Sequence, residues 1–278
     1  MSGIVPGNME AGAGLTGDAG MSKILTVERL FSGYGHQEIV QDVSFSVEEG
    51  EFCALLGLNG CGKTTLIKTI CGLLSARQGR CLVEGQDCTR LNERQWAQRI
   101  AYIPQRGSLI SGKTALDVVL MGYNPHLGLL ESPGRAKRQH AAEVLEKLGL
   151  GDRAQRDYSE LSEGQKQLVI LARTLVQDTP VLLMDEPDSA LDFVNRGMVL
   201  GKVRDILQTQ KRAGLITLHD PNFALAYCDR LLLMKEGRII RELPLKCVSP
   251  EAAEEALSEI YGKIRILRHP GGLVMVRA

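Results

Sequence analysis

The sequence lacks the features that mark several special classes of protein. Its seven cysteines stand singly, with no C-x-x-C pair and no histidine at metal-ligand spacing, which favours a reduced, intracellular chain. Its formal net charge is zero, so no basic field points to nucleic acid as a partner. No run approaches the roughly 18 apolar residues of a membrane span, and the Gly-rich N-terminus lacks the order of a signal peptide.

The chain is otherwise ordinary for a globular protein of one large or two small domains. It has 278 residues, of which 44% are hydrophobic and 24% charged, enough to bury a sizeable core. Four continuous apolar runs are typical of buried parallel strands: FCALLG, AYIP, VLLMD and LITLHD. Two others, ILTVERL and DVSFSV, alternate as antiparallel strands do. The pattern predicts an α/β fold.

The pattern also predicts how the chain is divided. Residues 1–22 are Gly-rich, and we expect a disordered tail there. Between Gln105 and Leu161 the blocks are helix-like, which indicates a helical insertion. A helix (SPEAAEEALSEIYG) and a terminal hairpin that turns at Pro270 to Gly272 follow. The predicted divisions are a main domain at 23–245, with a helical subdomain at about 106–176, and an extension at 246–278.

The strongest motif is a phosphate-binding loop. Residues 57–64, GLNGCGKT, fit G-x-x-x-x-G-K-[ST] directly after the predicted strand FCALL and before the predicted helix TLIKTICGLL. Gly60 and Gly62 allow successive N–H groups to face phosphate oxygens, Lys63 reaches the β- and γ-phosphates, and the Thr64 hydroxyl can ligate Mg²⁺. The predicted nucleotide-binding residues of this segment are Gly57, Asn59, Gly60, Cys61, Gly62, Lys63, Thr64 and Thr65.

Two acidic residues follow another predicted strand. VLLMDEP delivers Asp185 to the end of a buried strand, where its carboxylate can hold Mg²⁺. Glu186 comes next and can orient or deprotonate the attacking water. The alternative for two adjacent acids is a solvated loop.

With these motifs the chain resembles the ATP-binding cassette (ABC) ATPases over nearly all of residues 24–245. LSEGQ is similar to that family's signature motif, and SALD after MDEP to its D-loop. The resemblance implies the P-loop NTPase fold of an ABC cassette: a RecA-like parallel-sheet core, an antiparallel β subdomain and a helical insertion. It also implies that Gln105 is the Q-loop glutamine that senses Mg²⁺ and the γ-phosphate, His219 the switch histidine and Tyr34 the aromatic residue that stacks on adenine.

The resemblance explains why one chain carries two phosphate sites. In this family two cassettes pack head to tail, and each ATP lies between one subunit's phosphate loop and the other's signature motif. Ser162, Gly164 and Gln165 would then serve the partner's ATP, at the start of the predicted helix. Two residues depart from the family pattern: Glu163 replaces a usual glycine, and Asp188 a usual threonine. We expect both to tune turnover rather than abolish it.

Four residues or segments have simpler interpretations. Tyr34 could be a packed aromatic residue, and His219, taken alone, a loop histidine with satisfied hydrogen bonds. The basic RAKRQH cluster is interpreted as the solvated face of a helix. Trp96 is left to packing in the core or an interface.

The physiological role depends on partners outside the chain. The segment DVVLMGYNPHLGLL resembles the corresponding segment of the importers of iron–siderophore, haem, cobalamin and related metal chelates, although Tyr123 and Asn124 stand where those carry an arginine. SALDFVNR resembles the molybdate-type members of that group.

The resemblance implies ATP and Mg²⁺ as cofactors. It also implies a second cassette, integral membrane permease subunits and, indirectly, an extracytoplasmic substrate-binding protein as partners. We expect a location at the cytoplasmic face of the cell membrane. The alternative is a soluble cassette of non-transport role, such as iron–sulfur assembly.

Overall fold

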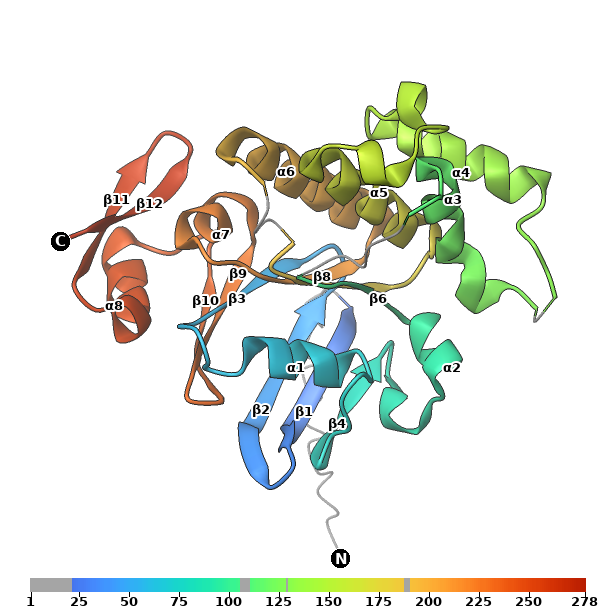
Figure 1. Cartoon of the computed structure of the whole chain (residues 1–278). Coiled ribbons are helices and arrows are strands. Elements are labelled where there is room, and N and C mark those ends of the chain that lie inside the picture. The colour runs from blue at the N-terminus through green and yellow to red at the C-terminus, as the bar shows by residue number, and fades with distance from the viewer. Residues whose placement is uncertain (1–21, 106–110, 129, 188–190) are drawn as a thin grey trace, which may run out of the picture.

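A six-stranded sheet lies at the centre of the molecule in the computed structural model, which describes residues 22–105, 111–128, 130–187 and 191–278 (Figure 1). Its strand order is β10-β9-β3-β8-β7-β6. The strands are β3 (Phe52–Leu56), β6 (Ile100–Ile103), β7 (Val181–Asp185), β8 (Ala213–Thr217), β9 (Arg230–Lys235) and β10 (Arg238–Pro244). All neighbours pair in parallel except β9 and β10, which pair antiparallel. The four predicted parallel strands are therefore present.

One predicted strand is shorter in the structure. The run LITLHD was expected to be extended to Asp220, but β8 ends at Thr217. The reason is local, because the Asp220 carboxylate accepts a hydrogen bond from the Asn222 N–H and so caps α7 (Pro221–Tyr227). His219 consequently lies in the short link between a strand and a helix.

A second, antiparallel sheet lies against the first across α1 (Lys63–Ile70), in the order β2-β1-β4-β5. Its strands are β1 (Lys23–Tyr34), β2 (Gln37–Glu48), β4 (Gln78–Val83) and β5 (Gln86–Asp87), followed by the 3₁₀ turn η1 (Cys88–Arg90) and α2 (Glu93–Ala97). Figure 1 shows this sheet and α1 on one side of the central sheet, with α5 and α6 on the other. The predicted antiparallel segments lie within β1 and β2.

Helices fill the predicted insertion. They are α3 (Ala115–Leu120), η2 (Met121–His126), α4 (Arg135–Lys147), η3 (Gly151–Arg153), η4 (Tyr158–Glu160) and α5 (Glu163–Val176). No strand element is found among the described residues from 111 to 161. The RAKRQH segment begins α4 and is largely exposed, as predicted. Arg106 and Gly107, where the predicted subdomain begins, lie outside the described residues.

The chain ends in a helix and a hairpin. After α6 (Phe193–Gln210) and α7 come α8 (Pro250–Tyr261) and the strands β11 (Ile264–His269) and β12 (Gly272–Arg277). The hairpin turns at Pro270 and Gly271, since His269 pairs with Gly272. Ile264, Ile266 and Leu273 belong to the same hydrophobic cluster as the helices of the main body. The expected tail falls almost entirely on residues 1–21, outside the described part of the chain.

Strand periodicity divides the core between the two faces of the central sheet. Phe52, Ala54 and Leu56 of β3 face the cluster built with the helices, while Cys53 and Leu55 face the cluster shared with α1 and the antiparallel sheet. All five are fully buried, as a strand covered on both faces requires. Among the described residues, no helix is both long and apolar enough to cross a bilayer.

A largely buried ion pair links the two sheets and gives a test of this packing. The Arg230 guanidinium on β9 donates to both carboxylate oxygens of Glu51, at 2.7 and 2.9 Å, and to the backbone carbonyl of Ser46 on β2. Arg230→Ala leaves the largely buried Glu51 carboxylate with the Glu48 N–H but without its cation, so we expect a loss of about 2–3 kcal/mol in the free energy of unfolding, measured by urea denaturation.

Arg241 provides the matched control, because its ion pairs with Glu255 and Glu259 lie on the surface. Arg241→Ala should cost less than about 1 kcal/mol. Equal losses in the two variants would contradict a structural role for the buried pair.

Candidate functional site

The loop between β3 and α1 surrounds a buried ammonium group. Lys63, the first residue of α1, is only 6% exposed, and its Nζ donates to the Gly57 carbonyl oxygen at 2.8 Å. A longer contact of 3.4 Å joins it to the Leu58 carbonyl. No described carboxylate forms an ion pair with it. A buried cation with only neutral partners, beside the N-terminus of a helix, is suited to bind an anion.

Glycines allow this loop to adopt its course. Gly60 and Gly62 have φ of 82° and 111°, in the region that favours glycine, and Gly62 is the N-cap of α1. At Gly57 a Cβ would lie 2.4 Å from the Met234 carbonyl oxygen. The Cys61 side chain turns toward Gly57, and burial raises the pKa of its thiol while the Lys63 charge lowers it in part.

The ends of β7 and β8 meet this loop through a chain of hydrogen bonds. The Asp185 carboxylate is 1% exposed, and its Oδ1 accepts from the Thr217 hydroxyl at 2.8 Å and from the Thr64 hydroxyl at 3.3 Å. Hydroxyl and carboxylate oxygens of this kind are ligands that Mg²⁺ prefers. The prediction of a solvated acidic loop is therefore not supported for Asp185.

Glu186 occupies a constrained position beside Asp185. Its φ is 48°, unusual for a residue with a side chain, and its N–H donates to the Thr217 hydroxyl at 2.8 Å. Its Oε2 lies 2.7 Å from the His219 Nε2 and also accepts from the Gln105 side-chain amide. The side chains of Gln105 and His219, from two other segments, thus meet at one carboxylate oxygen of Glu186, and the catalytic roles of the three residues stay predictions.

An open hollow of about 400 Å³ joins these groups. Its lining contains nine predicted site residues together with Ile39: Asn59, Gly60, Gly62, Lys63, Thr64, Thr65, Gln105, Glu186 and His219. Asp185 lies behind it, against Thr64. Gly57 and Cys61 shape the loop without lining the hollow.

The signature segment is not part of this hollow. Ser162 is the N-cap of α5: its hydroxyl accepts from the Gln165 N–H at 3.3 Å, and the Gln165 side chain accepts from the Ser162 N–H at 3.1 Å. A Cβ on Gly164 would lie 3.4 Å from the Asn195 side chain of α6. The Glu163 carboxylate pairs with Lys166 at 2.8 Å and is 62% exposed.

Tyr34 also lies outside the lining of the hollow. It ends β1, paired with Gln37, and is 48% exposed, so it is not a packed core residue. Arg77 fixes the turn that follows, donating to the Gly35 and Gln37 carbonyl oxygens at 2.6 and 3.0 Å. The stacking of Tyr34 on adenine stays a prediction.

The sequence reasoning missed two residues of the site. Thr217 is fully buried and bonded to both Asp185 and the Glu186 backbone, whereas its place in the run LITLHD marked it only as part of a buried strand. Ile39 lines the hollow from β2, and no local pattern marked it. Asp188 and the Ser189–Ala190 part of SALD lie outside the described residues.

Comparison with known proteins agrees with this geometry. Residues 40–189 match the family model described as ABC transporter. The hemin import ATP-binding protein of Pseudomonas fluorescens strain Pf0-1 is 35% identical over 89% of this chain and 96% of its own. A metal-chelate type ABC transporter in an inward-facing conformation aligns with a TM-score of 0.76 and 28% identity, over 91% of this chain and 96% of that one.

A solved dimer is also similar. The dimeric structure of a bacterial ABC transporter cassette aligns with a TM-score of 0.71 and 26% identity, over 81% of this chain and all of that one. The phosphate loop, the two acidic residues after β7 and the histidine after β8 thus occur together in a fold shared with cassettes of this kind. The chain belongs to the ABC transporter family and is one of its ATP-hydrolysing, nucleotide-binding subunits.

Proposed function

We propose that the chain is the ATPase subunit of an importer that takes up a metal chelate such as an iron–siderophore, haem or cobalamin. The observation that carries the ATPase part is the buried Lys63 ammonium, held by carbonyl oxygens at the N-terminus of α1 and facing the hollow. Among the described residues no carboxylate pairs with this ammonium group, and the phosphates of ATP would supply the missing negative charge. The import part is supported by the names of the hemin import protein and the metal-chelate type transporter.

Mg²⁺ fits the oxygen atoms beside Lys63. The Thr64 hydroxyl and the Asp185 carboxylate already lie within 3.3 Å of each other, and Gln105 lines the same hollow. These three residues would hold the ion, which when bound neutralises charge on the phosphate oxygens. Because Thr217 also donates to Asp185, the carboxylate has a fixed orientation toward Thr64.

Glu186 is the proposed base that activates water. In this structure its Oε2 is engaged by Gln105 and His219, so a water molecule would have to compete with these side chains for that oxygen. Binding of ATP would give Gln105 and His219 the γ-phosphate as an alternative partner and free the carboxylate for the water. The two side chains would then report the presence of a γ-phosphate to the base.

The signature segment is the proposed second half of a partner's ATP site. Ser162, Gly164 and Gln165 begin α5, a helix of 14 residues whose first N–H groups suit an anion. The ion pair with Lys166 turns the Glu163 carboxylate along the helix, so its charge need not oppose a phosphate. The dimeric cassette with the same fold supports a head-to-tail pair of this chain.

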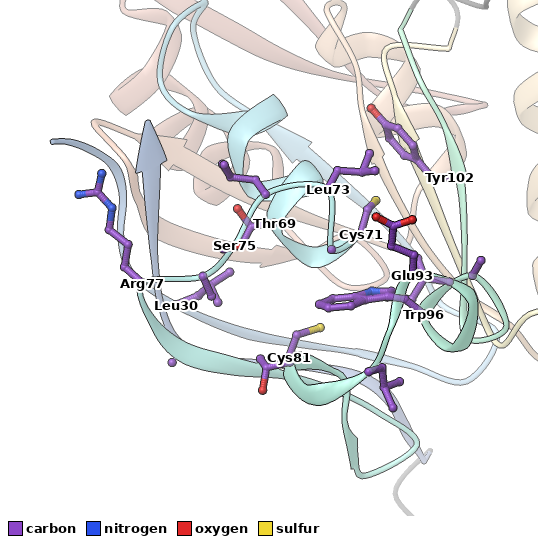
Figure 2. A pocket seen from close by; sticks show the side chains of 18 of the residues that line it. Leu30, Thr69, Cys71, Leu73, Ser75, Arg77, Cys81, Glu93, Trp96 and Tyr102 are labelled. Carbon is purple, nitrogen blue, oxygen red and sulfur yellow. The ribbon is translucent and has the colours of Figure 1, made fainter. Parts of the chain in front are cut away.

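A second hollow, of about 700 Å³, is the proposed contact with the permease. Figure 2 shows Trp96 extending into it, with Leu73 and Tyr102 nearby. The indole N–H donates to the Ile70 carbonyl at 2.9 Å, and the ring lies against Gly72 at the end of α1. Leu73 is 64% exposed there. Because the hollow joins the end of α1 to β6, just before Gln105, a permease segment bound here would contact the elements that hold the phosphates.

The alternative, a soluble cassette of iron–sulfur assembly, is less well supported. The relatives compared above carry names of import and metal-chelate transport. Purification with the products of neighbouring genes distinguishes the two, since import requires a polytopic membrane protein and the alternative a soluble scaffold.

Two substitutions separate binding of ATP from its hydrolysis. Lys63→Ala removes the buried cation, so ATP affinity should fall by about tenfold or more. Glu186→Gln keeps the shape of the side chain but removes its basicity, so ATP should still bind while kcat falls about 10²-fold or more. Nucleotide titration and phosphate release measure the two effects. Hydrolysis by Glu186→Gln at the wild-type rate would show that Glu186 is not the base.

Ser162→Arg tests the head-to-tail dimer. A bulky cation at the start of α5 should leave ATP binding to one subunit intact but prevent two subunits from closing on it. Gel filtration with ATP, in the Glu186→Gln background that traps the dimer, measures the result. Gln139→Arg, an exposed position of α4, is the control that should still dimerise. A dimer that persists in Ser162→Arg would refute the arrangement.

Leu73→Glu tests the permease contact. A charge on this exposed leucine should abolish transport by the complex reconstituted with its permease while the isolated chain keeps its ATPase activity within about twofold. Leu267→Glu, on a residue of the hairpin that is 50% exposed, is the matched control and should transport normally. Unchanged transport by Leu73→Glu would place the contact elsewhere.

A further inference from the structure

The C-terminal hairpin is bonded to the helix that follows His219. The side-chain amide of Asn222 accepts from the Met275 N–H at 2.7 Å and donates to the Met275 carbonyl at 3.2 Å. A neutral amide can pair in this way with both backbone groups of one strand residue, because it carries a donor and an acceptor side by side. Asn222 thereby occupies the free edge of β12, whose other edge pairs with β11.

The hairpin itself is held at two points. A two-stranded hairpin is at best marginally stable alone, so its position depends on its neighbours. On the β11 side the Ile266 N–H donates to the Glu254 carboxylate of α8 at 2.9 Å. On the β12 side the contact is α7, through Asn222. The hairpin therefore connects α8 to α7.

The other end of this connection is fixed to the central sheet. Arg241 of β10 donates to the Glu259 carboxylate of α8 at 2.7 Å. Tyr261, the last residue of α8, is half-buried and packs against the hydrophobic cluster of the main body. This burial raises the pKa of its hydroxyl to about 12.

The position of His219 depends on α7. Its side chain is 47% exposed, and its one ion-pair contact among the described residues is the 2.7 Å approach to Glu186. The residue lies between Thr217, which ends a strand in the interior of the sheet, and Asp220, which begins α7. Because the strand end is fixed by its neighbours on both sides, the placement of α7 decides where His219 stands.

We propose that Asn222 is a positioning residue for ATP hydrolysis: by binding Met275 it anchors α7 to the C-terminal hairpin and so keeps His219 in reach of Glu186. The inference rests on the roles proposed above for His219 and Glu186. It gives the C-terminal extension a task in catalysis, although none of its residues lines the hollow.

Asn222→Asp is the sharpest test, because it keeps the shape but sets a carboxylate oxygen against the Met275 carbonyl. We expect kcat of the full chain to fall about tenfold or more, since small misplacements of a catalytic group are costly, with KM for ATP within about twofold. Asn222→Ala removes both hydrogen bonds without repulsion and should lower kcat in the same direction. Val276→Ala, which shortens an exposed side chain beside Met275 on the same strand, is the control and should keep kcat within about twofold of wild type.

The effect must pass through His219. In the His219→Ala background, with residual hydrolysis followed in single turnovers, Asn222→Asp should change the rate less than about twofold, because contributions that share one path are not additive. A wild-type kcat in both Asn222 variants, or an undiminished loss in the His219→Ala background, would overturn the proposal. If His219→Ala itself hydrolyses ATP normally, the assigned role of His219 fails instead, and the two failures are thus distinguished.

Discussion

The Thr217 hydroxyl links the two acidic residues of the site, Asp185 and Glu186, to the central sheet. It donates to Asp185 at the end of the neighbouring strand and accepts from the backbone of Glu186. Because Thr217 is fully buried and β8 lies between β3 and β7, neither bond competes with water. The carboxylate of Asp185 and the backbone of Glu186 are therefore both held by one hydroxyl.

This arrangement leaves the remaining groups of the site free to change partners. Gln105, Glu186 and His219 come from separate segments that follow β6, β7 and β8, and they meet only through side chains. Lys63, by contrast, is fixed by carbonyl oxygens of its own loop. A rigid cradle beside a set of exchangeable hydrogen bonds is suited to an enzyme that must both hold a nucleotide and respond to its γ-phosphate.

Two surfaces distant from the phosphate loop are connected to the site through elements that pack on the central sheet. The hollow around Trp96 begins where α1 ends, so a permease bound there would act on the far end of the helix that starts at Lys63. The C-terminal hairpin reaches α7 from the other side through Asn222. Both connections run along short secondary elements that are packed on the sheet, which is how a small displacement can be transmitted without deforming the core.

Local patterns in the sequence predicted much of this molecule. The glycines of GLNGCGKT have meaning only where positive φ is needed, and Gly60 and Gly62 adopt it. Apolar runs such as FCALL and VLLM are typical of strands that are buried on both faces, and they lie in β3 and β7. The same rule would have identified RLLLMK as β9, which the sequence analysis did not list.

Tertiary structure decided what depends on distant pairs. Thr217 has an ordinary sequence context, and only strand order places its hydroxyl against Asp185. Asn222 and Met275 are far apart in the chain, and no periodicity could pair a helix amide with the edge of a hairpin. The predicted phosphate-binding residues of the loop lie in one short segment, so a local sequence pattern can identify them. The residues that position the site, such as Thr217 and Asn222, act through contacts between distant segments. Those contacts depend on tertiary packing, which no local sequence pattern specifies.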